Sequence, residues 1–151
     1  HAQLLSNSFT FTVYGKPAPQ GSKRHLGRGV MVESSNRVKP WRQDIKHAAE
    51  RLLPKEWHAI LPMRIKVSFL FARPQSHYRA NGQLKPSAPQ HCTARIGDLD
   101  KLVRALCDAL QGLCYLDDSQ IIEINAHRRY ASIDERPSAI VTIESFDAQS
   151  R

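Results

Sequence analysis

Residues 97–124 read GDLDKLVRALCDALQGLCYLDDSQIIEI, and this stretch decides how the chain is organised. Two aspartates two residues apart, Asp98 and Asp100, stand at its start, and two adjacent ones, Asp117 and Asp118, stand near its end. Between them, leucine and alanine recur every three or four residues, which is typical of one buried helix face. The stretch therefore predicts a helix with one pair of acids before it and a second pair after it.

This helix is expected to begin at Asp100, because aspartate is a favoured N-cap and its charge is stabilised near a helix N-terminus. Gly112 is a suitable residue for its end. After the second acid pair, residues 119–130 alternate in the manner of a strand. The expected buried positions are Leu102, Leu106, Ala109, Leu110 and Leu113 on the helix and Ile122, Ile124 and Ala126 on the strand, while Lys101, Arg104, Asp108 and Gln111 form the polar helix face.

The rest of the chain adds strands and a second helix. Alternation predicts strands at 8–14, 64–73 and 138–146, and a long loop at 74–97 is expected to be functional or mobile. Pro40 is well suited to the start of a helix. The apolar stripe of that helix consists of Trp41, Ile45, Ala48, Ala49 and Leu52.

Together these segments predict an α+β fold with a single mixed sheet of about four or five strands and two main helices packed on it. We expect one domain over residues 1–151. Residues 1–7 are expected to be flexible or to stem from the expression vector, and residues 15–39 to form a basic loop or arm with a short hairpin.

Positive charge is the strongest signal in the composition, since 22 lysines and arginines face 14 acids and give a formal charge of +8. Such a field attracts polyanions, of which nucleic-acid backbones are the commonest. Trp41, Tyr78 and Tyr115 are aromatic candidates for stacking on unpaired bases, although Trp41 also falls on the helix stripe. The candidate phosphate-binding residues are Lys16, Lys23, Arg24, Arg28, Lys39, Arg42 and Arg95, with Arg73, Arg79 and Lys85 as further candidates.

Three cysteines without the spacing of a disulfide framework favour reduced thiols and a cytoplasmic location. A zinc site from His91, Cys92, Cys107 and Cys114 is conceivable, but no pair has zinc-ligand spacing, so buried structural cysteines are the better interpretation. No apolar run has the ~20 residues that a membrane helix needs. Residues 1–8 lack the regions of a secretion signal, so none is expected.

The acids suggest a metal site. In extended backbone, residues i and i+2 point to the same side, so Asp98 and Asp100 can reach one hard cation. Mg²⁺, with Mn²⁺ as an alternative, prefers such oxygen ligands and usually keeps several waters. Asp117 and Asp118 would face opposite sides of a strand, so only one of them is expected to join. The alternative is that Asp100 is a simple cap and that the later pair solvates a turn.

The same stretch resembles the core signature of the RusA family of Holliday-junction resolvases, of the phage and actinobacterial type. That signature reads D-x-D-N-L-x-K, then D-A-L, then D-D-[SA]-Q, and DLD, DAL and DDSQ stand at the matching places. The segments YGKPAPQGSKR (14–24) and VKPWR (38–42) are similar to the family's amino-terminal region. The similarity spans the chain from about Phe9 to Phe146.

The resemblance implies a magnesium-dependent homodimeric endonuclease that resolves Holliday junctions by paired phosphodiester hydrolysis, without a small-molecule cofactor. The implied metal ligands are Asp98, Asp100 and Asp118, with Asp117 as a supporting acid. Lys101 replaces the family asparagine, and Arg104 replaces the family lysine. Either cation could stabilise charge on the phosphate, although an arginine essentially never transfers its proton.

A junction is nearly two-fold symmetric, so two symmetric cuts require two active sites, which a C2 dimer supplies. The alternative function is a branched-DNA-binding protein of the same fold that does not cut, which the two substitutions make conceivable. A phosphotransferase or glycosyltransferase using the DLD pair is a weaker alternative, because no strongly apolar strand precedes the pair. The number of metals, one or two, stays open.

Overall fold

The computed structural model describes residues 7–21, 23–26, 30–33, 36–92 and 97–147, with the backbone alone described in 23–26 and 30–33. Strands β1 (Asn7–Tyr14), β6 (Ser138–Ser145), β4 (Met63–Phe71) and β5 (Ile121–Tyr130) form one sheet in this order. Strands β2 (Lys23–Leu26) and β3 (Val30–Glu33) form a separate hairpin. The helices are α1 (Val38–Leu52) and α2 (Leu99–Leu110), and the short 3-10 turns are η1 (Gln75–His77) and η3 (Asp118–Gln120).

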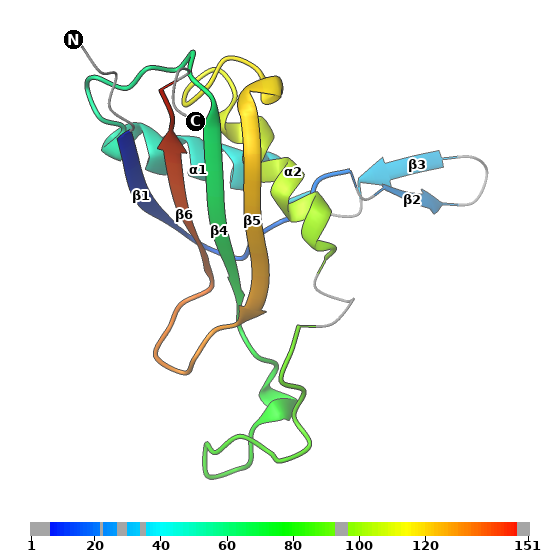
Figure 1. Cartoon of the computed structure of the whole chain (residues 1–151). Coiled ribbons are helices and arrows are strands. Elements are labelled where there is room, and N and C mark those ends of the chain that lie inside the picture. Colours follow the sequence, from blue (N-terminus) through cyan, green and yellow to red (C-terminus); the bar gives the residue numbers. More distant parts are fainter. Residues whose placement is uncertain (1–6, 22, 27–29, 34–35, 93–96, 148–151) are drawn as a thin grey trace.

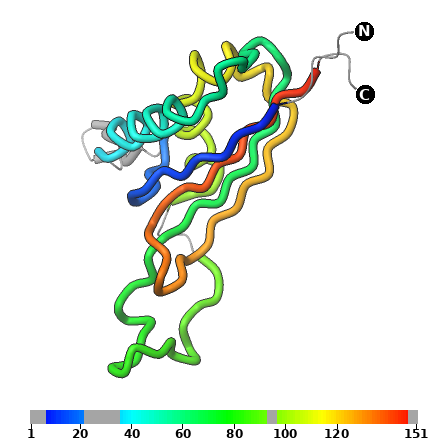
Figure 2. The backbone as a smooth tube through the Cα atoms, turned by 90° about the vertical axis from the view of Figure 1, so that its left-hand side faces the viewer, coloured from blue at the N-terminus to red at the C-terminus, as the bar shows by residue number. Residues whose placement is uncertain are grey.

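The sheet is mixed, as the sequence predicted. Strand β4 pairs with β5 in parallel and with β6 antiparallel, and β1 pairs with β6 antiparallel. A parallel pair needs a long crossover connection, and the chain between β4 and β5 contains α2. Both helices lie on one face of the sheet (Figure 1), and the view from the side shows the two layers (Figure 2). The α+β prediction with two main helices on one sheet is confirmed.

The core lies between this sheet face and the helices. Alternate residues of β1, β4 and β6 point into it, and Trp41 and Ile45 of α1 meet them there. The opposite face carries polar residues such as Lys66 and the Thr10–Thr142 pair, whose hydroxyls lie 2.8 Å apart. One apolar face and one polar face explain the alternation in the sequence.

Several expected boundaries differ from the structure. Helix α1 begins at Val38, so Pro40 is its third residue, where a missing N–H still costs nothing because the first four N–H groups have no helical acceptor. Leu52 was expected in the core, but it is the last residue of the helix and is 55% exposed. Strand β1 already begins at Asn7, inside the segment expected to lie outside the fold.

The N-cap of helix α2 lies two residues earlier than expected. Asp98, not Asp100, occupies the N-cap with extended backbone angles, and Asp100 lies in the first turn. The helix ends at Leu110, so Leu113 lies beyond it and is only partly buried. Gly112 has a φ of +87°, the left-handed conformation in which glycine is favoured after a helix.

Strand β5 is much more exposed than its alternation suggested. Ile122 and Ile124 are 62% and 43% exposed, so the prediction that both point into the core was wrong. Within the described chain β5 is an edge strand, with β4 as its neighbour on one side. The register shifts between Met63 and Arg64, which leaves Ile122 opposite no residue of β4.

The cysteines follow the structural interpretation. Cys107 and Cys114 are buried, Cys92 is partly exposed, and all three are free thiols. Burial raises the pKa of the Cys114 thiol to about 12. Among the described residues, no His/Cys/Asp/Glu group of three or more could hold a metal, so the zinc alternative has no support. None of the described helices has the length and apolar character needed to cross a membrane.

Leu106 and Leu52 give a matched test of this packing, since both are helical leucines but Leu106 has no exposed surface. We predict that Leu106→Ala lowers the free energy of unfolding by about 2–5 kcal/mol, because it leaves a cavity in the core. Leu52→Ala should change it by less than about 0.5 kcal/mol. Urea denaturation followed by circular dichroism measures both values, and equal effects would contradict the described core.

Candidate active site

The turn before α2 is held by two remote residues, Pro19 and Arg128. Gly97 has a φ of +101°, and a Cβ atom there would lie 2.8 Å from Cγ of Pro19, so a larger residue does not fit. The guanidinium of Arg128, on β5, donates a hydrogen bond to the carbonyl oxygen of Gly97. These contacts fix the backbone position of Gly97, which directly precedes the N-cap Asp98 and the first-turn Asp100.

Both carboxylates at this end of α2 are accessible. Asp98 caps the helix with its backbone, since its carbonyl oxygen accepts from the N–H groups of Lys101 and Leu102 at 3.1 Å each, while its side chain makes no capping bond. That side chain instead pairs with the Lys101 ammonium, with 3.1 Å between Oδ2 and Nζ. Asp100 is exposed in the first turn. Lys101 is therefore paired with Asp98 in this arrangement.

The second acid pair lies in the 3-10 turn η3, not in a strand. Asp117 caps this turn, because its Oδ2 accepts from the N–H of Ser119 at 2.9 Å. These bonds lower the pKa of the Asp117 carboxyl. Asp118 makes no such cap and is exposed. The expectation that only one of the two acids joins a metal cluster was argued from strand geometry, which does not apply in this turn, and it stays a prediction.

Gln120 anchors the same turn. Its Oε1 accepts from the N–H groups of Leu116 and Asp117 at 2.9 and 3.0 Å. Its Nε2 donates to the carbonyl oxygens of Ala59 and Leu61 at 2.6 and 2.9 Å. One partly buried amide therefore ties the acidic turn to the segment that leads into β4.

Asp118 faces the exposed side of α2 across an open pocket of about 570 Å³. The helix contributes Arg104, Cys107 and Asp108 to the lining of this pocket. The other side is formed by η3 and β5, which contribute Asp118 and Ile121 to Ile124. Partial burial, with the nearby negative charges of Asp108 and Asp117, raises the pKa of the Asp118 carboxyl. Like charges gathered in this way are relieved by a bound cation.

The loop between β1 and the hairpin lies over this helix face. The backbone N–H of Gln20 donates to the Lys101 carbonyl oxygen at 3.0 Å. Its side chain donates to the Asp108 carboxylate and accepts from the Arg42 guanidinium of α1. Gly21 follows next to Arg104, whose Nη1 would lie 3.3 Å from a Cβ at that position. Gln20 therefore connects the loop, both helices and the pocket.

The three acids implied as metal ligands, Asp98, Asp100 and Asp118, do not form a ligand group in the described part of the chain. The physical reason is the helix between them. A helix rises 1.5 Å per residue, so Asp100 and Asp108 are separated by about 12 Å along the axis, and Asp118 is near Asp108. The donors are carboxylates, which suit Mg²⁺, but this chain by itself does not assemble a complete set. Sharing of one ion stays a prediction.

The structure describes only some of the expected DNA-binding residues. Lys16 and Lys39 are exposed, and Arg42 is partly buried against Gln20. The side chains of Lys23, Arg24, Arg28 and Arg95 lie outside the described residues. Stacking by Tyr115 is excluded, since this side chain is fully buried and its hydroxyl donates to the Cys107 carbonyl oxygen at 2.6 Å. Trp41 is also buried, as its place on the helix stripe predicted.

Sequence reasoning missed the residues that position the acids. Gln20, Gln120 and Arg128 each make contacts across 31 to 88 positions of the chain. Local periodicity carries no information on such pairings. The one available signal was the DDSQ motif, which pointed to Gln120 without indicating its role.

The chain is similar to known proteins over most of its length. The family model described as Endodeoxyribonuclease RusA matches residues 14–144. The "Uncharacterized protein YqaN" of Bacillus subtilis (strain 168) is 27% identical over 143 residues, which cover 91% of this chain and 96% of that protein. The matched region includes α2, η3 and the loop that carries Gln20.

Gln120 and Gln111 offer a test of the acidic turn. Gln120→Ala removes four hydrogen bonds to the backbone, so we predict a loss of roughly 1–3 kcal/mol in the free energy of unfolding. The control is Gln111→Ala at the exposed end of α2, which should cost less than about 0.5 kcal/mol. Urea denaturation of both variants measures the difference, and an unchanged stability of Gln120→Ala would refute the anchoring role.

Proposed function

Because the chain belongs to the RusA endodeoxyribonuclease family, we propose that it is a metal-dependent endonuclease that resolves Holliday junctions by symmetric phosphodiester hydrolysis. The observation that carries the proposal is the exposed side of α2. Acids at both of its ends, Asp98 with Asp100 and Asp108 with Asp118, flank the cations Lys101 and Arg104. A basic chain has no structural need for acids gathered on one face.

RusA nucleases are generally dependent on a divalent metal, and the carboxylates of this face have the chemistry that Mg²⁺ or Mn²⁺ requires. We propose that Asp98 with Asp100 at one end of α2, and Asp118 at the other end, supply ligands to metal ions, with Asp117 supporting the turn that carries Asp118. When bound, such an ion polarises the phosphate and lowers the pKa of a bound water. In its absence the same acids would repel a phosphate backbone.

The cations on α2 have separable roles in this proposal. Lys101 pairs with Asp98 and thereby orients the acid pair. Arg104 is exposed on the next turn, beside the pocket that contains Asp118. An arginine presents several donors in a fixed plane and keeps its charge, so Arg104 is suited to stabilise negative charge that grows on the phosphate. We therefore assign the role of the family lysine to Arg104.

Substrate binding is assigned to the basic segments around the helix. One group of candidates comes before α1 in the sequence or in its first turns and consists of Lys16, Lys39 and Arg42. A second group falls in the sequence segment 23–33 and consists of Lys23, Arg24 and Arg28. Arg95 precedes the acid pair in the sequence. Phosphate contacts of this kind release counterions, so binding should weaken steeply with salt.

Two symmetric cuts in a junction need two sites related by a two-fold axis, so we propose that the active form is a homodimer. The second candidate function is a junction-binding protein that does not cut. It is favoured by the two departures from the family pattern, Lys101 and Arg104, and by the absence of a complete ligand group among the described residues.

Asp100→Asn decides between these candidates. We predict that it abolishes cleavage of a synthetic four-way junction in Mg²⁺, because a neutral amide is a poor ligand, while junction binding persists or tightens. Gel analysis of nicked products and binding measured in Ca²⁺ separate the two effects. Asp134→Asn, an exposed acid in the turn before β6, is the control that keeps its activity. Cleavage by Asp100→Asn at the wild-type rate would remove this residue from the site.

The role of Arg104 has its own test. Arg104→Ala should lower the single-turnover cleavage rate by about 10²–10³, the usual cost of removing one charge-stabilising donor. Arg104→Lys should retain most of the rate, since the positive charge remains. If Lys101→Ala were the more damaging change while Arg104→Ala cleaved normally, the assignment of roles would be reversed.

A further inference from the structure

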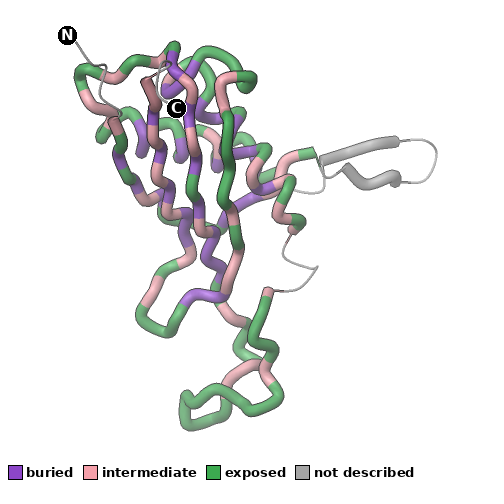
Figure 3. Tube along the Cα trace, in the orientation of Figure 1, coloured by how far each residue is buried: buried purple, intermediate pink, exposed green. Residues whose placement is uncertain are grey.

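The segment between β4 and α2 forms a projection, residues 74–92, which we call the arm. It leaves the sheet at the end of β4 and extends away from the body of the protein (Figure 1, Figure 2). Most of it is exposed (Figure 3). The arm with the adjoining Arg73 contains three lysines or arginines, namely Arg73, Arg79 and Lys85, and no aspartate or glutamate.

The base of the arm is fixed to the sheet. The guanidinium of Arg73 lies 4.4 Å from the centre of the Tyr130 ring, a cation–π contact. Its Nη1 also donates to the carbonyl oxygen of Pro89 at 2.7 Å, which joins the two ends of the arm. His77 meets the Tyr130 ring edge-on at 5.4 Å. Arg73 was expected to bind phosphate, but these contacts give it a positioning role.

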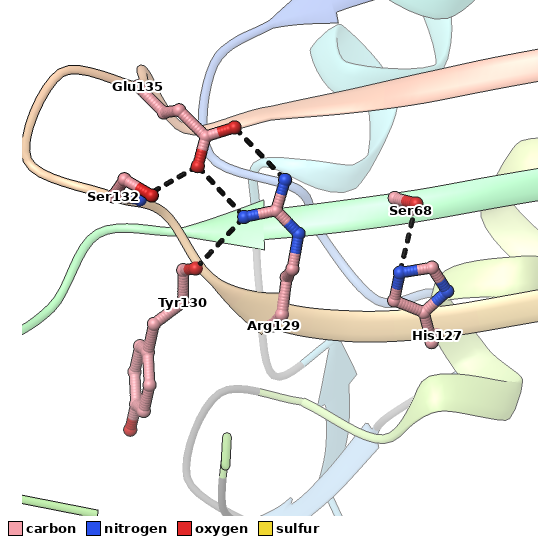
Figure 4. A network of polar contacts seen from close by, with 6 residues as sticks. All are labelled: Ser68, His127, Arg129, Tyr130, Ser132 and Glu135. Atoms are coloured by element: carbon pink, nitrogen blue, oxygen red, sulfur yellow. Dashed lines mark hydrogen bonds and ion pairs between the residues drawn. The ribbon is translucent and has the colours of Figure 1, made fainter. Parts of the chain in front are cut away.

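Glu135, which lines a pocket beside this base, is already paired (Figure 4). Both carboxylate oxygens of Glu135 accept from the Arg129 guanidinium, at 2.8 and 3.0 Å, and Ser132 donates its backbone N–H to one of them at 2.8 Å. These bonds lower the pKa of Glu135 to about 2. Glu135 is the acid among the residues that line the pocket next to Arg79. It is therefore not available to neutralise the arm.

The outer part of the arm is an ordered turn. Tyr78 and Leu84 pair as an antiparallel bridge. Two backbone hydrogen bonds flank the bridge, from Arg79 N–H to Gln83 at 2.7 Å and from Lys85 N–H to the carbonyl oxygen of His77 at 2.9 Å. The backbone that carries Arg79 and Lys85 is thus held before any partner binds, which lowers the entropy cost of binding.

Arg79 and Lys85 themselves are exposed, and neither side chain makes a hydrogen bond or ion pair within the described residues. Two unpaired cations on a fixed turn, with no acid in the segment, are complementary to closely spaced phosphates. The N-terminal end of α2, where Asp98 and Asp100 lie, is on the side of the molecule from which the arm extends (Figure 1).

We propose that the arm is a second DNA-binding element, which holds phosphates away from the cleaved bond through Arg79 and Lys85. This inference rests on the proposed function, because it takes the DNA to lie across the exposed side of α2. The base of the arm is packed against Tyr130 at the end of β5, so the arm is attached to the sheet at a defined point.

The test uses the double variant Arg79→Ala/Lys85→Ala in the full-length protein. We expect its Kd for a four-way junction to rise roughly 10-fold, and the slope of log K against log salt to fall by about 0.9 for each lost contact. Fluorescence anisotropy over a range of NaCl concentrations gives both values. The matched control is Lys55→Ala/Lys66→Ala, which removes the same charge from exposed positions after α1 and on the open sheet face.

The outcomes separate the two proposals. If the Arg79→Ala/Lys85→Ala variant had the same junction affinity and salt slope as the control variant, the role of the arm in DNA binding would be overturned. Its cations would then be only solvated or would bind another class of partner. Wild-type protein that binds junctions but never cleaves them would overturn the proposed nuclease and leave the arm intact. Both substituted positions are exposed, and an unchanged circular dichroism spectrum verifies that the variant folds.

Discussion

The packing of α2 on the sheet is the constraint on which the candidate site depends. Leu102, Leu106 and Leu110 have no exposed surface. Because a helix repeats every 3.6 residues, burial of this stripe turns Arg104 and Asp108 to the opposite side. The position of the charges therefore follows from the hydrophobic core, and loss of this packing would displace the charged groups together with the helix.

The exposed side of α2 brings together charges that would otherwise be unfavourable. Partial burial, together with the nearby charges of Asp108 and Asp117, raises the pKa of the Asp118 carboxyl. Neutral amides position the groups here: Gln20 joins Asp108 to Arg42, and Gln120 ties down the turn. Amides hold acids in place without neutralising them, which suits acids that must remain free for a cation.

Two segments that extend from the body of the protein suit the proposed binding of a branched substrate. The hairpin of β2 and β3 and the arm both extend away from the layers of the fold (Figure 1). The arm is fixed at its base by Arg73 and Tyr130. Contacts at separate points restrict the orientation of bound DNA, and orientation at the reacting phosphate contributes to rate as well as to affinity.

Local patterns in the sequence determined the strands, both helices and the acids that flank α2, because a buried face imposes its period on neighbouring residues. Which aspartate caps the helix was decided only by the fold, since Gly97, Pro19 and Arg128 set the backbone at Asp98. The exposure of β5 was likewise decided by its place at the sheet edge. The hydrophobic period of the sequence shows which residues share one side of a helix or strand. The contacts between segments that are remote in the sequence are determined only when the chain packs into its fold.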